Sequence, residues 1–447
     1  MNLLAVVLGA LCFLWPAILN GYPLVFSDTG GFLNQALGPD TGWDKPWIYG
    51  PFLTPFHACL TLWPAAFGQC LILSAALWLT QVTLGCPNRV RHVVVCIILA
   101  AGTAASWFAS QLMPDIFAPI TVLGLFILAY RPAQLGPATV AAVTLVTAVA
   151  IASHLAHLIL AAACIGTLAL LRWRILWRPA IPLAGALLLL VLANTVAFDR
   201  LAISPYGSVF ALARLVADGP AREYLRTTCP TRDAPRLCAW QDRLPIDSDA
   251  FLWEPHGVMW GGEFGPTLLA PEASSIVAAT IRTHPVAVLI AALRNTARQL
   301  AMVRVGDSLV PDHLDVTIGK RIGQFFPPAE LSRYDAALQP RGELNARAAT
   351  VAPLHLVLLL LGAVGTATLT NGLRRGHHPL AVFAALVLVA LLANAFSTGA
   401  LSGPHDRYQA RIAWLVLLPP LLWISRAPAR RPGPLPLLPA NARSSVG

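Results

Sequence analysis

The chain has 447 residues, of which 56% are hydrophobic and only 12% are charged. Soluble domains carry about 25% charged residues, so this composition excludes a soluble globular protein and indicates an integral membrane protein. The formal net charge of +10 does not indicate a nucleic-acid partner, because the positive residues gather in short loops and in the C-terminal tail, as they do on a cytoplasmic membrane face.

Segments that are long and apolar enough to cross a bilayer recur along the chain. A bilayer-crossing helix needs about 20 apolar residues, and we find about ten such segments. The first resembles a signal peptide, but it lacks a basic start and a cleavage site ahead of a soluble domain, so we predict an uncleaved span. The predicted spans are residues 2–21, 61–84, 93–112, 116–130, 137–153, 156–171, 180–198, 351–370, 379–397 and 410–425.

The loops between these spans alternate in charge. With the N-terminus inside the cell, every strongly basic loop falls on the cytoplasmic side, as the positive-inside rule requires, whereas an odd number of spans would break the pattern. We therefore predict a protein of the bacterial plasma (inner) membrane with both termini cytoplasmic. The predicted inside segments are 88–92, 131, 172–178, 374–378 and the tail, and the outside segments contain Asp28, Asp115, His154, His157, residues 199–350 and Asp406.

Residues 199–350 interrupt the alternation of spans and loops. They are mixed in charge and too long for an ordinary loop, so we predict a mixed extracytoplasmic insertion domain. The fold class is an all-α polytopic membrane protein of about ten transmembrane helices with this insertion. Its predicted parts are an N-terminal membrane module, 1–198, with a structured first external loop, 22–60; the external domain, 199–350; a C-terminal membrane module, 351–425; and a Pro-rich, disordered tail, 426–447.

The insertion contains one amphipathic segment, which begins at Pro285. Apolar residues recur at helical spacing as far as Val303, and Arg294 and Arg298 fall on another face. This pattern is typical of a helix that lies on the membrane surface. A buried helix in the core of the external domain is the alternative.

Cys229 and Cys238 lie in a polar part of the insertion. Outside the membrane a disulfide between them is the natural interpretation. A metal site is poorly supported, because no other Cys or His keeps ligand spacing with the pair. The remaining cysteines lie in or beside apolar runs, and we predict that they are small core residues.

Two carboxylates are predicted at the external membrane face. Asp28 is the first charged residue of the chain and precedes Gly30 and Gly31, where the backbone can turn tightly. Asp115 lies in the very short connection between the third and fourth spans. A carboxylate at this depth is costly unless it is solvated or used, so both are candidate catalytic residues and metal ligands. The structural alternative for each is a helix cap.

His154 and His157 are three residues apart, next to the start of the sixth predicted span. In a helix this spacing places both side chains on one face, where they could bind a metal or a phosphate. Two histidines in a loop can also be merely solvated.

A dense polar run, residues 402–411, precedes the last span. Arg407 and Arg411 are one helical turn apart, so we predict that they present two guanidinium groups to one phosphate. Asp406 could pair with either arginine and weaken that role. Anchoring among lipid headgroups is the alternative.

In the insertion, Trp253 and Glu254 belong to a stretch in which aromatic residues stand beside carboxylates and glycines. This composition resembles a surface on which sugars stack. A loop packed on the membrane face explains it as well.

These features together resemble glycosyltransferase superfamily C, the polytopic membrane enzymes that take sugars from polyprenyl-phosphate donors, of the mannosyltransferase and arabinose-transferase type. The match covers most of spans one to seven and the last span. It lies in Asp28 after the first span, the Asp28-to-Phe32 spacing, the proline–aromatic stretch 45–51, the second acid Asp115 and the pair Arg407–Tyr408.

The resemblance implies an inverting sugar transfer at the extracytoplasmic face, from a lipid-linked donor to a glycan, lipid or protein acceptor. It implies that Asp28 is the base, assisted by Asp115, and that a divalent metal, Mg²⁺ or Mn²⁺, could bind between them. By position, the resemblance assigns the donor phosphate to Arg407 and Arg411. From the residues themselves we add Lys45 and His405 as candidate phosphate contacts, and His154, His157, Tyr408, Trp253 and Glu254 as candidate substrate contacts.

Two other classes of function also suit a polytopic protein. One is a transporter or flippase of lipid-linked envelope precursors, although few charges fall within the spans. The other is a non-catalytic envelope assembly protein that uses the external domain as a docking surface. Hydrolase, ATPase and redox functions lack their motifs: the sequence has no nucleophile elbow, Walker motif, zincin helix or paired CxxC.

Overall fold

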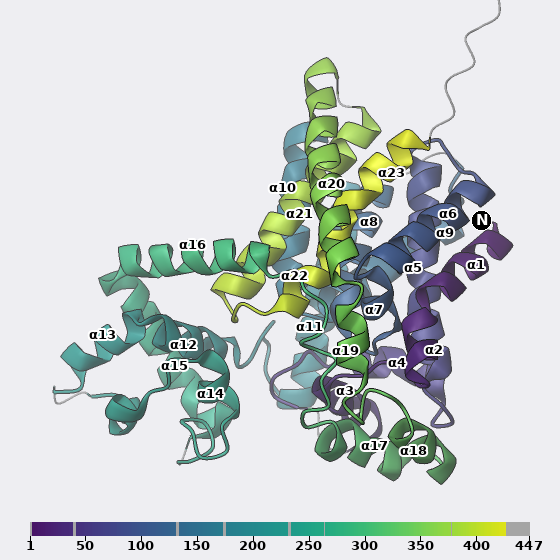
Figure 1. Cartoon of the computed structure of the whole chain (residues 1–447). Coiled ribbons are helices and arrows are strands. Elements are labelled where there is room, and N and C mark those ends of the chain that lie inside the picture. Colours follow the sequence, from purple (N-terminus) through teal and green to yellow (C-terminus); the bar gives the residue numbers. More distant parts are fainter. Residues whose placement is uncertain are drawn as a thin grey trace, which may run out of the picture.

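The computed structural model describes residues 2–38, 42–130, 134–172, 176–230, 234–262, 264–376 and 378–425. Within these ranges the protein is all α-helical, as predicted, and the only pairing of extended backbone is an isolated parallel bridge between Leu24 and Gln111. Figure 1 shows a bundle of long helices with a smaller helical arm at one side. The predicted tail, 426–447, lies outside the described residues.

Each predicted span coincides with a helix or with a broken run of helices. Breaks occur where the sequence disfavours a continuous helix: Pro16 begins the second piece of the first span, and Pro419 lies in the last piece of the final one. The bundle helices are α1 (Leu3–Phe13), α2 (Trp15–Asn20), α5 (Trp63–Thr83), α6 (Arg89–Gly102), α7 (Ala105–Ser110), α8 (Phe117–Tyr130), α9 (Pro137–Ala152), α10 (Ala156–Arg172), α11 (Trp177–Phe198), α20 (Ala352–Thr370), α21 (Pro379–Ala395), α22 (Asp406–Ala413) and α23 (Leu418–Ile424).

Among the described residues, four helices are long and apolar enough to cross a membrane: Trp63–Thr83, Trp177–Phe198, Ala352–Arg374 and Pro379–Ala400. A fifth is counted if the pair α15 (Gly265–Thr283) and α16 (Pro285–Ala301), bent by 101°, is taken as one span. The several other apolar helices are shorter. These helices agree with a membrane-spanning protein. The number of about ten spans stays a prediction.

The helices of the bundle pack closely against one another, and their outer surface is apolar. Leu360 on α20 is 69% exposed, which suits a surface covered by lipid. On the opposite side of the same helix, a Cβ added at Gly362 would lie 2.9 Å from the backbone of Leu417. Glycine thus allows α20 to pack closely against η7 (Trp414–Leu417), in the middle of the last predicted span.

The side arm has a hydrophobic core of its own, built from residues between Tyr206 and Ile276. Within the residues described it consists of helices, so the mixed insertion domain predicted from the sequence is all-helical there. Cys229 and Cys238 are joined by a disulfide beside this core. In chain order the arm contains α12 (Gly207–Asp218), α13 (Pro220–Thr228), η3 (Arg236–Arg243), α14 (Ser248–Trp253), α15 and α16.

The second part of the insertion leaves the arm and returns to the bundle. Its residues Leu314, Ile318 and Tyr334 belong to the main hydrophobic core. It packs against α3 (Ser27–Leu37) of the first external loop, and Phe326 contacts His57 at the end of α4 (Tyr49–His57). The predicted domain 199–350 is therefore two structural parts rather than one. The returning part contains η4 (Asp315–Gly319), α17 (Lys320–Phe325), α18 (Pro328–Asp335) and α19 (Leu344–Ala349).

Candidate functional site

Helix α3 presents Asp28 in its first turn. The helix begins at Ser27, and the Thr29 hydroxyl accepts a hydrogen bond from the Phe26 N–H at 2.9 Å. The same hydroxyl donates to the Leu112 carbonyl at 3.0 Å, which ties the helix start to the connection that precedes Asp115. Thr29 therefore caps the helix, and the carboxylate of Asp28 is left for other contacts.

The extended segment that leads into α3 is positioned by buried amide side chains. Gln339 from the returning part accepts from the Val25 N–H at 3.1 Å and donates to the Val25 carbonyl at 2.7 Å. Gln111 donates to the same carbonyl at 3.1 Å. Buried backbone groups need such partners, so the position of Asp28 depends on residues far along the chain.

Asp28 lies between two cations. Its carboxylate is 3.2 Å from Lys45 Nζ and 3.6 Å from Arg407 Nη2, and the Asp28 side chain is 29% exposed. Lys45 also pairs with Asp44. Burial opposes ionisation, but Lys45 and then Arg407 outweigh it and lower the pKa of Asp28 below its ordinary value. We call Asp28, Lys45, Arg407 and His405 the outer group.

Arg407 is fixed on several sides and still has a free donor. Its guanidinium lies 4.3 Å from the centre of the Phe26 ring and 4.8 Å from that of Tyr408. Its backbone N–H donates to Asp307 at 2.8 Å. Among the described residues its Nη1 atom has no hydrogen-bond partner although it is buried. A buried cationic donor without a partner favours an anionic ligand.

His405, the remaining member of the outer group, lies at the join between the bundle and the arm. Its Nε2 is 3.2 Å from the carboxylate of Asp249 on α14. Both side chains are partly exposed, at 41% and 47%, so this is the open edge of the site.

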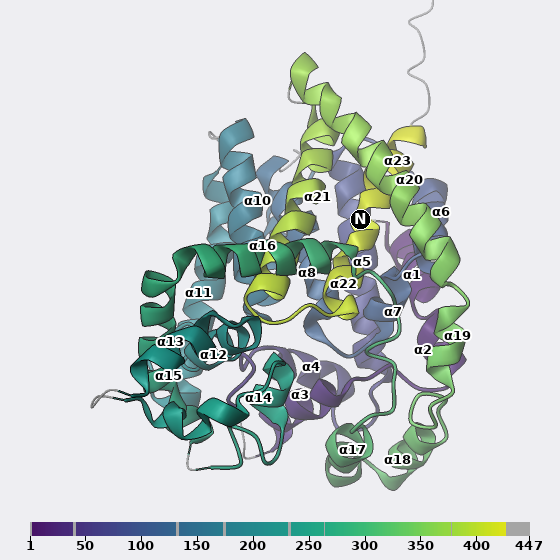
Figure 2. The same ribbon diagram turned by 60° about the vertical axis from the view of Figure 1, so that its left-hand side comes forward.

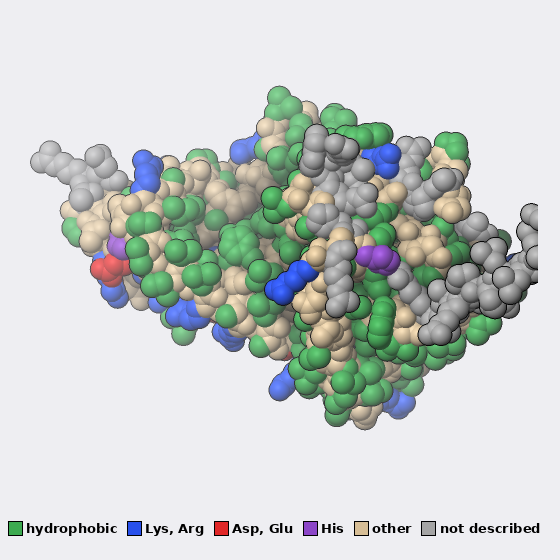
Figure 3. Space-filling view, turned by 90° about the horizontal axis from the view of Figure 1, so that it is seen from above, with side chains coloured by type: hydrophobic (Ala, Val, Ile, Leu, Met, Phe, Trp, Pro, Cys, Tyr) green, Lys and Arg blue, Asp and Glu red, His purple; other side chains and the backbone are tan. Residues whose placement is uncertain are grey.

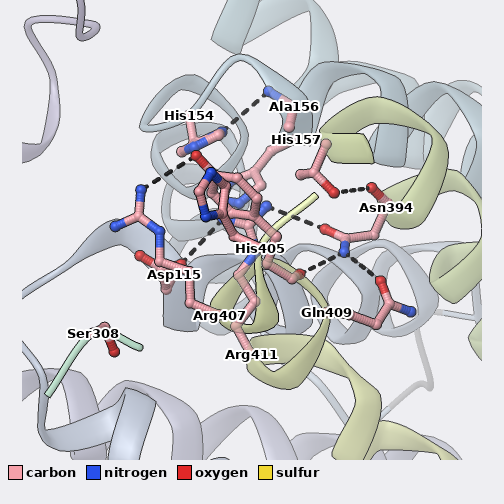
Figure 4. A network of polar contacts seen from close by, with 12 residues as sticks. Asp115, His154, Ala156, His157, Ser308, Asn394, His405, Arg407, Gln409 and Arg411 are labelled. Atoms are coloured by element: carbon pink, nitrogen blue, oxygen red, sulfur yellow. Dashed lines mark hydrogen bonds and ion pairs between the residues drawn. The ribbon is translucent and has the colours of Figure 1, made fainter. Parts of the chain in front are cut away.

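Asp115 and Arg411 form a buried pair, here called the inner pair, close to Arg407 and His405 (Figure 4). Their side chains are 3.2 Å apart and 3% and 0% exposed. Arg411 also donates to the Asn394 side-chain oxygen at 3.1 Å. The predicted clamp of Arg407 and Arg411 on one phosphate is therefore wrong for this conformation, because the two guanidinium groups face different carboxylates and Arg411 is enclosed.

The two histidines lie near the inner pair. The sequence predicted both on one helix face, and this is wrong, because only one of them belongs to a helix. His154 precedes α10 and His157 belongs to it, and their rings stack with centres 5.1 Å apart. The His154 ring is also 6.3 Å from that of Tyr408, which lies between the two arginines. The Nδ1 atom of His157 contacts the Ala150 carbonyl at 2.7 Å, and its buried Nε2 has no partner among the described residues.

Trp253 lies at the C-terminal end of α14, one turn after Asp249. It is 44% exposed, and its ring centre is 5.6 Å from that of Trp43, two residues before Lys45. Glu254 follows, also exposed. Trp43 and Trp253 thus form an aromatic contact close in sequence to Lys45 and to Asp249, the partner of His405.

The carboxylates do not make a ready site for a divalent metal. Asp28 is already neutralised by Lys45 and Arg407, and Asp115 by Arg411. In the described parts of the chain no group of three or more His, Cys, Asp or Glu side chains could hold a metal ion. Hard divalent cations need several oxygen ligands, so the residues present do not fit the predicted Mg²⁺ or Mn²⁺.

A surface cavity of about 590 Å³ lies elsewhere, on the returning part of the insertion. Leu314, Tyr334 and Arg341 are among its lining residues, none of which belongs to the outer group or the inner pair. The charged residues Asp315, Asp335 and Arg341 also line this cavity, but it is separate from the ion pairs of Asp28 and Asp115, at which we place the candidate site.

Sequence reasoning missed several residues of the network. Asn394 carried a usable signal, because an amide within an apolar span is costly without a function. Asp249 and Asp307 carried none, since their approach to His405 and Arg407 depends on how the insertion folds back.

No protein-family model matches the sequence, and the comparisons with curated proteins and with solved structures found no match. The function is therefore inferred from the chemistry of the site.

Proposed function

We propose that this protein is a membrane glycosyltransferase of the superfamily C type, which transfers a sugar from a polyprenyl-phosphate donor at the extracytoplasmic face of the bacterial inner membrane. The observation that carries the proposal is a partly exposed carboxylate, Asp28, lying between Lys45 and Arg407, with a donor of Arg407 unpaired. The Asp28 carboxylate is suited to accept a proton, and Lys45 and Arg407 are suited to bind a phosphate.

The transfer needs a base and a charged leaving-group site at adjacent positions. The acceptor hydroxyl oxygen attacks the anomeric carbon of the sugar, its proton passes to Asp28, and the bond from that carbon to the phosphate oxygen breaks. The released polyprenyl phosphate carries additional negative charge, which Lys45 and Arg407 stabilise, with His405 as a further hydrogen-bonding contact. Asp115 and Arg411 act as positioning residues, and no step requires a metal.

The ion pairs of the outer group also suggest how donor binding prepares the base. In the free protein Lys45 and Arg407 keep Asp28 ionised. A donor phosphate would compete for both cations, and each contact that it takes from Asp28 leaves the carboxylate more basic. Binding and activation of the base are then coupled.

Purified protein in nanodiscs, incubated with a panel of polyprenyl-phosphate sugars and a glycan acceptor mixture, tests the proposal. We expect release of sugar-free polyprenyl phosphate together with a glycosylated product. Movement of intact donor across a vesicle bilayer without cleavage would instead identify a flippase, and the absence of both activities across the panel would contradict the proposed chemistry.

A change in Lys45 is expected to move the acid limb of the pH–rate profile. The carboxylate must be ionised to act as a base, and Lys45 lowers the pKa of Asp28, so Lys45→Met should raise that pKa and shift the loss of kcat/KM to higher pH. The profiles of wild type, Lys45→Met and the charge-keeping control Lys45→Arg would be measured from mildly acidic to neutral pH. Superimposable profiles for wild type and Lys45→Met would exclude Asp28 as the titrating base.

A further inference from the structure

Helix α16 has its apolar side outward and its polar side inward. The outward residues Val286, Leu289, Ile290 and Leu293 are 67%, 58%, 59% and 60% exposed. The buried residues of the same helix include Asn295, Thr296 and Gln299. A helix of a soluble domain has the reverse arrangement, so the alternative of a core helix is wrong.

The place of α16 in the fold explains the exposed apolar side. It crosses the C-terminal end of α21 rather than running parallel to it, and it contacts η6 (Phe396–Ala400), which follows α21 (Figures 1 and 2). The rest of the arm lies on the other side of α16 (Figures 1 and 2). Phe396 and Leu401 at that contact are 41% and 45% exposed, so the apolar side of α16 continues an apolar surface of the bundle. Seen from above, this arm shows mainly hydrophobic and uncharged side chains, with Lys and Arg at its edges and Asp or Glu at its outer end (Figure 3).

The inward side of α16 contacts the candidate site. Gln299 donates from Nε2 to the His405 carbonyl at 2.7 Å, and its Oε1 accepts from the His405 N–H at 3.0 Å. Asn295 donates to both carboxylate oxygens of Asp218, a residue of the arm, at 2.9 Å. One helix therefore connects the arm to the loop that carries His405 and Arg407.

We propose that α16 lies in the lipid–water interface of the outer leaflet, with its apolar side among acyl chains and with Arg294 and Arg298 on anionic lipid headgroups, and that Gln299 transmits this seating to the loop of the outer group. Helical spacing places both arginines beside the apolar side, where an interfacial helix carries its cations. Arg294 pairs with Asp218 at 3.8 Å, but its side chain is 65% exposed, so the guanidinium can also contact a headgroup. The role of Gln299 rests on the proposed function; the seating of α16 does not.

A bilayer accounts for this surface better than a second copy of the chain does. The apolar side of α16 is continuous with the bundle surface that lipid covers in any membrane-spanning arrangement, whereas a protein partner would have to bind beside a lipid-covered face. The basic rim adds a preference for anionic lipids.

Photo-crosslinking tests the seating without reference to catalysis. The photoreactive residue p-benzoylphenylalanine replaces Leu293 in one protein and, as a control, Ile246, which is 80% exposed in the arm away from α16. In nanodiscs of phosphatidylglycerol and phosphatidylethanolamine we expect lipid adducts at position 293 and none at 246. Adducts at neither position, or a crosslink from 293 to a second chain, would overturn the proposal.

Two variant proteins separate the parts of the inference. Arg294→Gln combined with Arg298→Gln should reduce phosphatidylglycerol adducts at 293 and leave those with phosphatidylethanolamine; an unchanged ratio would refute the headgroup contacts. Gln299→Met removes both hydrogen bonds to the His405 backbone, so the melting temperature should fall modestly. It should leave the adducts unchanged and raise the donor KM more than it lowers kcat. An unchanged KM in a protein that still transfers sugar would refute the positioning role alone.

Discussion

Asp28→Asn is expected to reduce kcat for sugar transfer by about 10²–10⁴-fold, the usual contribution of a positioned general base. The amide keeps the size of the side chain but cannot accept the hydroxyl proton. The substitution also removes the negative charge that lies between Lys45 and Arg407. Both cations then face the donor phosphate without competition, so the donor KM should stay the same or fall while kcat collapses.

Asp44→Asn provides the matched control for this prediction. Asp44 also pairs with Lys45, but it is not paired with Arg407. Its loss should change kcat only a little. Steady-state rates with varied donor concentration distinguish the two variants. Near wild-type kcat in Asp28→Asn would exclude Asp28 as the base, and equal losses in both variants would indicate a general effect of charge.

Arg411→Met is expected to destabilise the protein by about 3–5 kcal/mol, because it leaves the carboxylate of Asp115 buried without its counter-charge. Asp115 is 3% exposed and lies 3.2 Å from Arg411, so water cannot readily replace the lost partner. The same substitution frees the acceptor oxygen of Asn394, which adds a smaller cost. Thermal unfolding in detergent, followed by the loss of monodisperse protein, measures the change.

A double-mutant cycle shows whether the pair itself is responsible. Asp115→Leu combined with Arg411→Met replaces both charges by apolar groups, which is often close to neutral for a buried pair. We therefore expect the double variant to be more stable than Arg411→Met alone. The single variant Asp115→Leu completes the cycle. If the losses of the two single variants add up to that of the double variant, the inner pair has no energetic coupling and its proposed positioning role fails.

The amino-acid pattern was sufficient to locate the helices of the bundle, because a bilayer imposes one strong requirement on each spanning segment. It was not sufficient for the insertion. The predicted domain 199–350 lacked an internal division. No local pattern indicates that Leu314 and Ile318 join the main core while Leu269 joins the core of the arm. Such a division follows from tertiary contacts alone.

The candidate site was predicted in part for a similar reason. Loop charges placed Asp28, Asp115 and Arg407 on one face, and the structure brings these residues into one connected network. The choice of partners was beyond sequence reasoning: Arg407 and Arg411 are one turn apart, yet one faces Asp28 at the open edge and the other is enclosed with Asp115. Burial decides that difference, and burial depends on α3 and η1 (Pro114–Ile116), distant in sequence.

The hydrogen bonds between Val25 and Gln339 have a consequence for biosynthesis. The two residues are separated by 314 positions. At about 5–20 residues per second, a ribosome needs about 15–60 s to synthesise the intervening chain. During that time the segment before Asp28 has left the first span without the partner that fixes its backbone. The carboxylate is among the first residues made, but the partner of its lead-in segment comes only after most of the protein has been translated. The nascent protein cannot complete the network until α22, which carries Arg407 and Arg411, has emerged.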